Sequence, residues 1–198
     1  VDEDRWILSR LSQAVATVHG HLEAYNPAAA LSTARDFFWS ELCDWYLEFI
    51  KPRLRDTVRA ALARQVLAMT IDQVLRLLHP FVPYITEALW EPLNAQAPVR
   101  GIDAPLPASE LLIQAAWPTA HPAWRDTALE AHMTFLQEVV RAISDLRSQY
   151  TISPHARVPA RLRAAGEAAA TLRAWTDLLT TMAGLESVEI APDMPRSP

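Results

Sequence analysis

Residues 4–25 read DRWILSRLSQAVATVHGHLEAY, and the placing of their apolar residues decides the fold class. Apolar residues recur there at spacings of three and four, which puts them on one face of a helix. They are Ile7, Leu11, Ala14, Val18, Leu22 and Tyr25. Asn26-Pro27 follows and ends that helix, because proline supplies no backbone donor. The chain therefore opens with an amphipathic helix whose apolar face needs a partner.

Two longer segments and one shorter one continue the same periodicity. Residues 31–50 carry it with Leu31, Ala34, Phe38, Leu42, Trp45 and Phe49. Residues 54–78 carry it with Val58, Leu62, Val66, Met69 and Val74 as candidates for burial, and Pro83 to Trp90 forms a fourth helix. Lys51-Pro52 is expected to end the second helix and begin the third. Four helices with short connections predict an antiparallel bundle without strands in the first ninety residues.

The sequence beyond the fourth helix changes character. Residues 92–122 are rich in proline and read as a loop, and residues 123–149 read as a fifth helix. Alternation at 157–162 and 186–191 predicts strands on either side of a helix at 167–182. Gly101, Gly166 and Gly184 fall at predicted breaks, and Gly20 falls inside a helix. We expect a mainly α protein, with a helical bundle at 1–118 and a helix plus small α/β module at 119–198.

Composition limits the partners and the compartment. Half of the 198 residues are hydrophobic, and the formal net charge is -5, so any contact with nucleic acid must come from a local basic patch. Cys43 is the single cysteine and permits no internal disulfide. The start of the chain lacks the features of a signal peptide, and no apolar run reaches the length of a membrane span. These features favour a cytoplasmic protein with no membrane partner.

The motifs of catalysis and metal binding do not occur in the sequence. There is no phosphate-binding glycine loop, serine nucleophile elbow or paired Cys-x-x-Cys. His19 and His21 point away from each other on a helix and do not share a metal. Glu41, Asp44 and Glu48 read as a solvated acidic stripe, with Glu48 paired to Lys51, and Cys43 reads as a buried core thiol. We therefore expect no catalytic residue and no metal.

Two basic segments remain as candidate binding surfaces. Lys51, Arg53, Arg55, Arg59 and Arg64 lie close together with Asp56 as the only acid among them. Arg141, Arg147, Arg157, Arg161 and Arg163 surround the turn at 150–154. Phe37, Trp39 and Tyr46 lie one helix away from the first segment, and the core is the favoured place for Phe37 and Tyr46. The residues alone predict a helical binding module.

Three stretches resemble the anticodon-binding bundle of the class I aminoacyl-tRNA synthetases for valine, isoleucine and leucine. They are DRWILSRL at 4–11, ELCDWYLE at 41–48 followed by Lys51, and LLHPFVPYITEALW at 77–90. LIQAAWP at 112–118, VRAISDLR at 140–147 and Ile152-Ser153-Pro154 are similar to later segments of the valyl enzymes. The CDWY form of the middle motif is typical of the valyl family. An isoleucyl or leucyl enzyme with an altered motif, or a helical protein-interaction module, is the alternative.

The resemblance implies a fragment of a ligase that joins valine to its tRNA with ATP and magnesium. The fragment would bind the anticodon arm as a monomer, and it would be non-catalytic because the His-Ile-Gly-His and Lys-Met-Ser-Lys-Ser signatures are absent. His79, Pro80, Pro83 and Trp90 fit an inter-helix turn, and Trp6 and Trp45 fit the core. The residues expected to bind tRNA are Lys51, Arg53, Arg55, Arg59, Trp39, Arg147 and Arg157.

Overall fold

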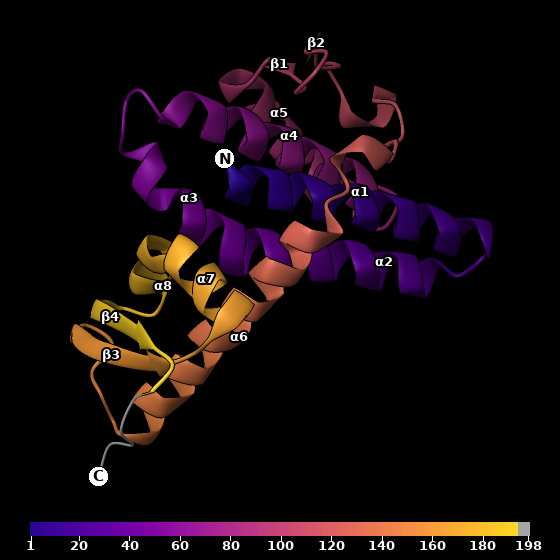
Figure 1. The fold of residues 1–198 in the computed structure, drawn as a ribbon. Coiled ribbons are helices and arrows are strands. Elements are labelled where there is room, and N and C mark those ends of the chain that lie inside the picture. The colour runs from indigo at the N-terminus through magenta and orange to yellow at the C-terminus, as the bar shows by residue number, and fades with distance from the viewer. Residues whose placement is uncertain (194–198) are drawn as a thin grey trace. The chain divides into compact units, whose positions relative to one another are not determined.

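The computed structural model describes residues 1–193 and divides the chain into two compact units. Unit 1 comprises Val1–Thr127, and unit 2 begins at Ala128. Unit 1 is the helical bundle, and unit 2 combines helices with a two-stranded sheet, as Figure 1 shows. The prediction of a mainly α fold with a small α/β part is therefore confirmed.

Unit 1 is built from helices joined by short turns. They are α1 (Asp2–Glu23), α2 (Pro27–Asp36), the π-helix η1 (Phe37–Tyr46), α3 (Leu47–Leu54), α4 (Ala60–Leu78) and α5 (Pro83–Gln96). The α1–α2 turn is set by local chemistry, since Asn26 accepts a hydrogen bond from the Ala29 N–H and Pro27 occupies the first turn of α2. Because α1 packs against α2, η1 and α4, it is the central element of the bundle (Figure 1).

The core of unit 1 lies largely where the helical periodicity predicted it, but Tyr25, which was predicted on the apolar face of the first helix, follows the end of α1 and is 94% exposed. Ile7, Leu11, Leu42 and Val66 are almost completely buried. Trp6 and Trp45 are buried as well, and each ring lies against Phe49, with centroids 5.7 and 5.8 Å apart. Such aromatic pairs add to the stabilisation that comes from burial alone.

The prediction that Lys51-Pro52 separates two helices is wrong. Helical backbone continues without a break from Pro27 to Leu54, and Pro52 lies inside α3. An interior proline costs about 3 kcal/mol. Phe49 and Ile50 are buried on the same short helix, and burial of each contributes about 1.5–3 kcal/mol. Their packing outweighs the one missing hydrogen bond.

Val58 and Leu62 were predicted to be buried, and both are exposed. Val58 is 86% exposed and lies before the first residue of α4. The helix starts late because the Asp56 carboxylate accepts hydrogen bonds from the N–H groups of Val58 and Arg59, at 2.9 and 3.2 Å. This turn replaces the first helical turn that the periodicity predicted.

Residues 97–126 form an irregular strap across the bundle. The strap contains the antiparallel pair β1 (Val99–Arg100) and β2 (Leu106–Pro107) and the 3-10 turns η2 (Leu112–Gln114) and η3 (Pro122–Trp124). These two short strands lie in the segment that was predicted to be a loop, within the expected helical bundle at 1–118. Gly101 has a φ of 134°, and a Cβ atom there would lie 2.8 Å from the Ala104 carbonyl oxygen, so this turn requires glycine.

The end of the strap is fastened to α1. The Ser12 hydroxyl donates to the His121 carbonyl at 2.8 Å and accepts from the His121 N–H at 2.9 Å. Ser9 receives the N–H of Asp126 at 2.9 Å, and the Arg5 guanidinium lies 2.7 Å from the Asp126 carboxylate. Residues 121–126 therefore belong to unit 1, and the division between the units falls after them.

Unit 2 begins with α6 (Thr127–Gln149) and continues through β3 (Val158–Arg163), α7 (Gly166–Ala174), α8 (Thr176–Met182) and β4 (Leu185–Ala191). The two strands are parallel, with Ala160 paired to Val188 and Leu162 paired to Ile190. A parallel pair needs a crossover connection, and α7 and α8 supply it. The predicted single helix at 167–182 is divided at Trp175, and Leu146 of the predicted apolar stripe is 54% exposed. Gly166 and Gly184 have positive φ, as expected at breaks.

Candidate nucleic-acid interface

Four exposed cations lie together where α3 ends and α4 begins, and we call Lys51, Arg55, Arg59 and Arg64 the basic corner. Lys51 pairs with Glu48, as the sequence predicted. Among residues 1–193, Arg55, Arg59 and Arg64 form no salt bridge. Asp56, the one acid within residues 51–64, is engaged by the backbone of its own turn. The corner therefore presents largely uncompensated positive charge to solvent.

Arg53 does not belong to that exposed surface. Its guanidinium forms two parallel hydrogen bonds with the Asp4 carboxylate, both 2.8 Å long. Both side chains are buried, with 8% of the Arg53 side chain and 5% of the Asp4 side chain exposed. Tyr46 completes the cluster by donating its hydroxyl to Asp4 at 2.7 Å. A guanidinium enclosed in this way does not reach RNA, which corrects the assignment of Arg53 to a binding surface.

The electrostatics of the cluster follow from its geometry. The hydrogen bond to Asp4 raises the pKa of Arg53, because it stabilises the charged guanidinium. Burial, reinforced by the negative charge of Asp4, raises the pKa of the Tyr46 hydroxyl. Arg53 therefore remains charged, and the tyrosine remains a neutral donor. The cluster fixes α1 against η1 and α3 and has no group free for chemistry.

The aromatic residues of η1 divide into core and surface. Phe37 and Tyr46 are buried, as the sequence analysis favoured. Trp39 is 58% exposed, and its ring lies edge-on to Phe38 with the centroids 5.0 Å apart. Both belong to the π-helix, a conformation that occurs often at functional sites. Trp39 is therefore held in place and open to solvent.

The arginines of unit 2 bond mainly to backbone carbonyls. Arg147 donates to the carbonyl oxygens of Gly184, Ser153 and Ala156 at 3.1, 2.8 and 2.7 Å. Arg157 donates to the Leu185 carbonyl at 3.2 Å. These bonds fasten the turn at 150–157 to the start of β4. Neither arginine forms a salt bridge with a carboxylate in the described residues.

Other candidate chemical groups have structural partners. Glu41 receives two hydrogen bonds from Arg10, at 2.7 and 2.8 Å, which is unsuited to a free acid or base. Cys43 is half-buried rather than fully buried as expected, and burial raises the pKa of its thiol. His19 lies 3.2 Å from Glu23. In the described part of the chain, no group of three or more His, Cys, Asp or Glu side chains is arranged to hold a metal.

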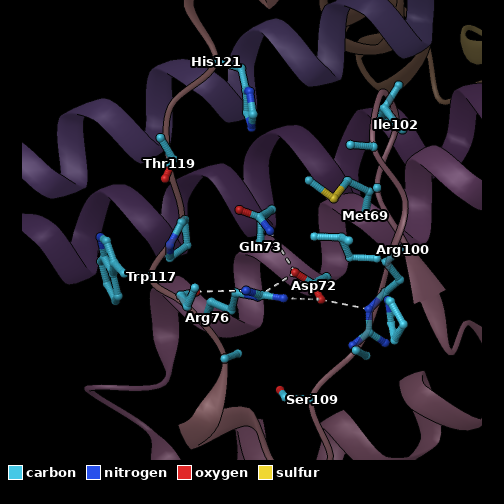
Figure 2. A pocket seen from close by; sticks show the side chains of 18 of the residues that line it. Met69, Asp72, Gln73, Arg76, Arg100, Ile102, Ser109, Trp117, Thr119 and His121 are labelled. Atoms are coloured by element: carbon cyan, nitrogen blue, oxygen red, sulfur yellow. Dashed lines mark hydrogen bonds and ion pairs between the residues drawn. The ribbon is translucent and has the colours of Figure 1, made fainter.

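A pocket of about 510 Å³ lies between α4 and the strap, and Figure 2 shows its side chains. Asp72 lies at its base between two arginines, with Arg76 Nε at 2.7 Å and Arg100 Nε at 2.8 Å. Arg100 also covers the Trp90 ring at 4.2 Å, and Arg76 donates to the Ala116 carbonyl at 2.9 Å. The charged groups of this pocket hold the strap in place.

The α4–α5 turn has the structural role that the sequence suggested. His79 Nδ1 lies 2.8 Å from the Thr86 hydroxyl, which also donates to the Val82 carbonyl at 2.9 Å. Trp90 is completely buried and donates to the Ser109 carbonyl at 2.9 Å. None of the helices in residues 1–193 has both the length and the apolar character needed to cross a membrane.

Sequence comparison identifies the family. Residues 4–162 match the model described as the anticodon-binding domain of tRNA ligase. The chain belongs to this family. Its match begins at Asp4 and includes Tyr46 and Arg53, so the buried cluster lies within the shared domain. The matched region includes unit 1 apart from residues 1–3, and β3 apart from Arg163.

Three relatives of this anticodon-binding domain are valine–tRNA ligases. The chain is 37% identical to a valine–tRNA ligase of Rhodopirellula baltica over 96% of its length, and 38% identical to that of Symbiobacterium thermophilum over 84%. It is 31% identical over 96% to the valine–tRNA ligase of Legionella pneumophila strain Paris. These matches cover 18%, 19% and 20% of the respective relatives. The chain therefore spans about a fifth of the length of the relatives it matches.

Proposed function

We propose that this chain is the tRNA-binding part of a valine–tRNA ligase and that it docks on the anticodon arm. The family of the domain supports the tRNA partner, and the shared name of the relatives supports valine over isoleucine and leucine. Ligation, with its ATP and magnesium, is assigned to other parts of the longer polypeptide. We place the protein in the cytoplasm and propose that it acts as a monomer.

The proposed contact surface is the basic corner together with Trp39. The observation that carries it is the absence of salt bridges to Arg55 and Arg59 within the described residues, at a site where four cations gather. Like charges at helical spacings repel by a few tenths of a kcal/mol per pair, and a phosphate backbone relieves that repulsion. Trp39 offers an exposed ring for stacking on a base. Arg147 and Arg157 of unit 2 are proposed as secondary contacts, and Arg53 is withdrawn.

Replacing Arg55 and Arg59 together by alanine is expected to weaken tRNA binding and reduce its dependence on salt. Each lost phosphate contact lowers the slope of log affinity against log salt by about 0.7–0.9. Two lost contacts should therefore flatten the slope by nearly two units. The free energy of unfolding should change by no more than about 0.5 kcal/mol per substitution, because both side chains are exposed. The measurement is tRNA binding across a salt series, with thermal melting alongside.

The matched control replaces Arg35 and Arg173 by alanine. Both are exposed, lie on α2 and α7, and carry the same total charge as the tested pair. A general effect of net charge would lower affinity equally in the two double variants. A folded Arg55→Ala/Arg59→Ala variant with the affinity and slope of the parent would place the docking surface elsewhere.

The isolated chain is expected to be inactive in the ligation reaction. The two nucleotide-binding signatures of class I enzymes are absent from its sequence, and the buried charged groups are committed to structural pairs. Valine-dependent exchange of pyrophosphate into ATP should not exceed the rate without protein. Exchange that requires valine, persists through purification and scales with chain concentration would contradict this expectation.

A further inference from the structure

Unit 1 carries a second surface whose chemistry is opposite to that of the basic corner. Tyr84, Ile85 and Leu89 of α5 are all exposed, with Tyr84 at 92%. On the neighbouring strap, Leu111 and Ile113 are exposed on either side of Leu112, with Ile113 at 73%. Single exposed apolar side chains are normal on protein surfaces, but a cluster of large ones marks a place where another molecule binds.

Three of these side chains, Tyr84, Leu111 and Ile113, line a groove between α5 and the strap. Its volume is about 750 Å³, and we call it the α5 groove. One wall consists of Tyr84, Ala88 and Glu91, which follow each other at spacings of four and three along α5. The other wall is Glu110, Leu111 and Ile113. His79, Pro83 and Glu87 complete the lining.

The walls of the groove are fixed to each other. The Glu87 carboxylate accepts hydrogen bonds from the N–H groups of Leu112 and Ile113, at 2.7 and 3.3 Å. One turn along α5, the Trp90 indole and the Asn94 amide both donate to the Ser109 carbonyl, each at 2.9 Å. A partner would therefore meet a preformed surface and would not have to order the strap as it binds.

The charge around the groove selects the partner. Glu91 and Glu110 are exposed, and neither forms a salt bridge with a residue in the described range. Of the lining residues, only His79 is basic, and its Nε2 lies 3.9 Å from Glu87. Carboxylates repel a phosphate backbone and attract lysine and arginine, which argues for a basic polypeptide and against RNA.

We propose that the α5 groove binds a basic amphipathic helix of a protein partner. Apolar side chains of that helix enter the groove between Tyr84 and Ile113, and lysine or arginine side chains beside them pair with Glu91 and Glu110. A helix fits because the α5 wall repeats at helical spacing, so ridges of a second helix pack along it. This inference does not rest on tRNA binding, since it concerns a different surface of unit 1.

The test uses a synthetic helical peptide with leucines at spacings of three and four and lysines at the edges of the leucine stripe. Fluorescence anisotropy is expected to show that the whole chain binds it at least about tenfold more tightly than a peptide with glutamate in place of lysine. The Tyr84→Ser/Ile113→Ser variant and the Glu91→Lys/Glu110→Lys variant should each lower affinity for the lysine peptide by about tenfold or more. All four positions are exposed, so the fold should be retained.

Matched variants separate the groove from the rest of the surface. Val58→Ser/Leu106→Ser removes two equally exposed apolar side chains, and Glu138→Lys/Glu186→Lys makes the same change in charge in unit 2. Both should bind the lysine peptide like the parent, and the groove variants should bind tRNA like the parent.

Several results would overturn the proposal. The first is no binding of the lysine peptide, and the second is an equal loss of affinity in the matched variants. The third is a loss of affinity in the Glu91→Lys/Glu110→Lys variant only, which would mean that the peptide is attracted by surface charge and does not enter the groove. A fall in tRNA affinity of the Tyr84→Ser/Ile113→Ser variant would instead make the groove part of the RNA surface. Self-association of the parent that this variant abolishes would make a second copy the occupant.

Discussion

Alanine in place of Arg53 is expected to lower the free energy of unfolding by about 3–5 kcal/mol. The substitution leaves the Asp4 carboxylate buried, with the Tyr46 hydroxyl as its remaining side-chain donor. An uncompensated buried charge is far more costly than the loss of a surface ion pair. Urea unfolding of the variant and the parent, followed by circular dichroism, measures the difference.

Arg55→Ala is the control, because it removes the same type of side chain from an exposed position two residues further along the chain. Its free energy of unfolding should stay within about 0.5 kcal/mol of the parent. Adding Tyr46→Phe to Arg53→Ala should give a non-additive loss, since both side chains bond to the same carboxylate. Similar small effects of Arg53→Ala and Arg55→Ala would contradict the buried cluster.

Asp72→Ala is expected to lower the free energy of unfolding by a similar amount, about 3–5 kcal/mol, and to loosen the strap in particular. The carboxylate is almost fully buried and pairs with Arg76 and Arg100 (Figure 2). Burial lowers the pKa of Arg100, and the Asp72 carboxylate compensates the positive charge of its buried guanidinium. Removing Asp72 should therefore release β1 and the residues around it. Urea unfolding measures the stability, and limited proteolysis within residues 97–118 measures the release.

Asp103→Ala provides the comparison for the strap. Asp103 is exposed, and its contact with a described side chain is a hydrogen bond of 3.3 Å from the Trp124 indole. In the Asp103→Ala variant, the free energy of unfolding and the rate of proteolysis within residues 97–118 should both stay close to those of the parent. A variant without Asp72 that resists protease as well as the parent does would show that other contacts hold the strap.

The buried faces of the helices were predictable because they obey one simple rule of spacing. Ile7 and Leu11 of α1, Leu42 of η1 and Val66 of α4 each belong to a run of apolar residues spaced by three or four, the spacing of one helical face. All four are buried. The same rule fails where local chemistry changes the backbone. Val58 is exposed because the side chain of Asp56 holds a turn there, which a count of apolar residues does not detect.

The sequence indicates that Arg53 is buried, but it does not indicate which residue Arg53 pairs with. Arg53 follows Tyr46, Phe49 and Ile50 at helical spacings, so it shares the face of three buried residues. Asp4 likewise shares a face with Ile7, Leu8 and Leu11. A charged residue in such a stripe indicates a buried pair, because isolated buried charges are too costly. The pairing of residue 4 with residue 53 depends on the tertiary fold and has no pattern in the sequence.

The exposure of the candidate binding residues was predicted correctly for some of them and wrongly for Arg53. Exposed cations such as Arg55 and Arg59 need no particular partner, so composition alone locates them. The α5 groove could not be predicted, because its walls come from segments that helical spacing does not relate. Tyr84 and Ile113 become neighbours of one groove only when Glu87 binds the backbone of the strap.

Because residues 121–126 are bonded to α1, the first and last segments of unit 1 lie next to each other. Asp126 lies against Arg5 and Ser9, so the two ends of unit 1 are adjacent in space. A domain with adjacent ends can be carried between other domains, exchanged or circularly permuted without stretching its neighbours. During synthesis, α1 therefore cannot form its contacts with residues 121–126 until nearly all of unit 1 has been made.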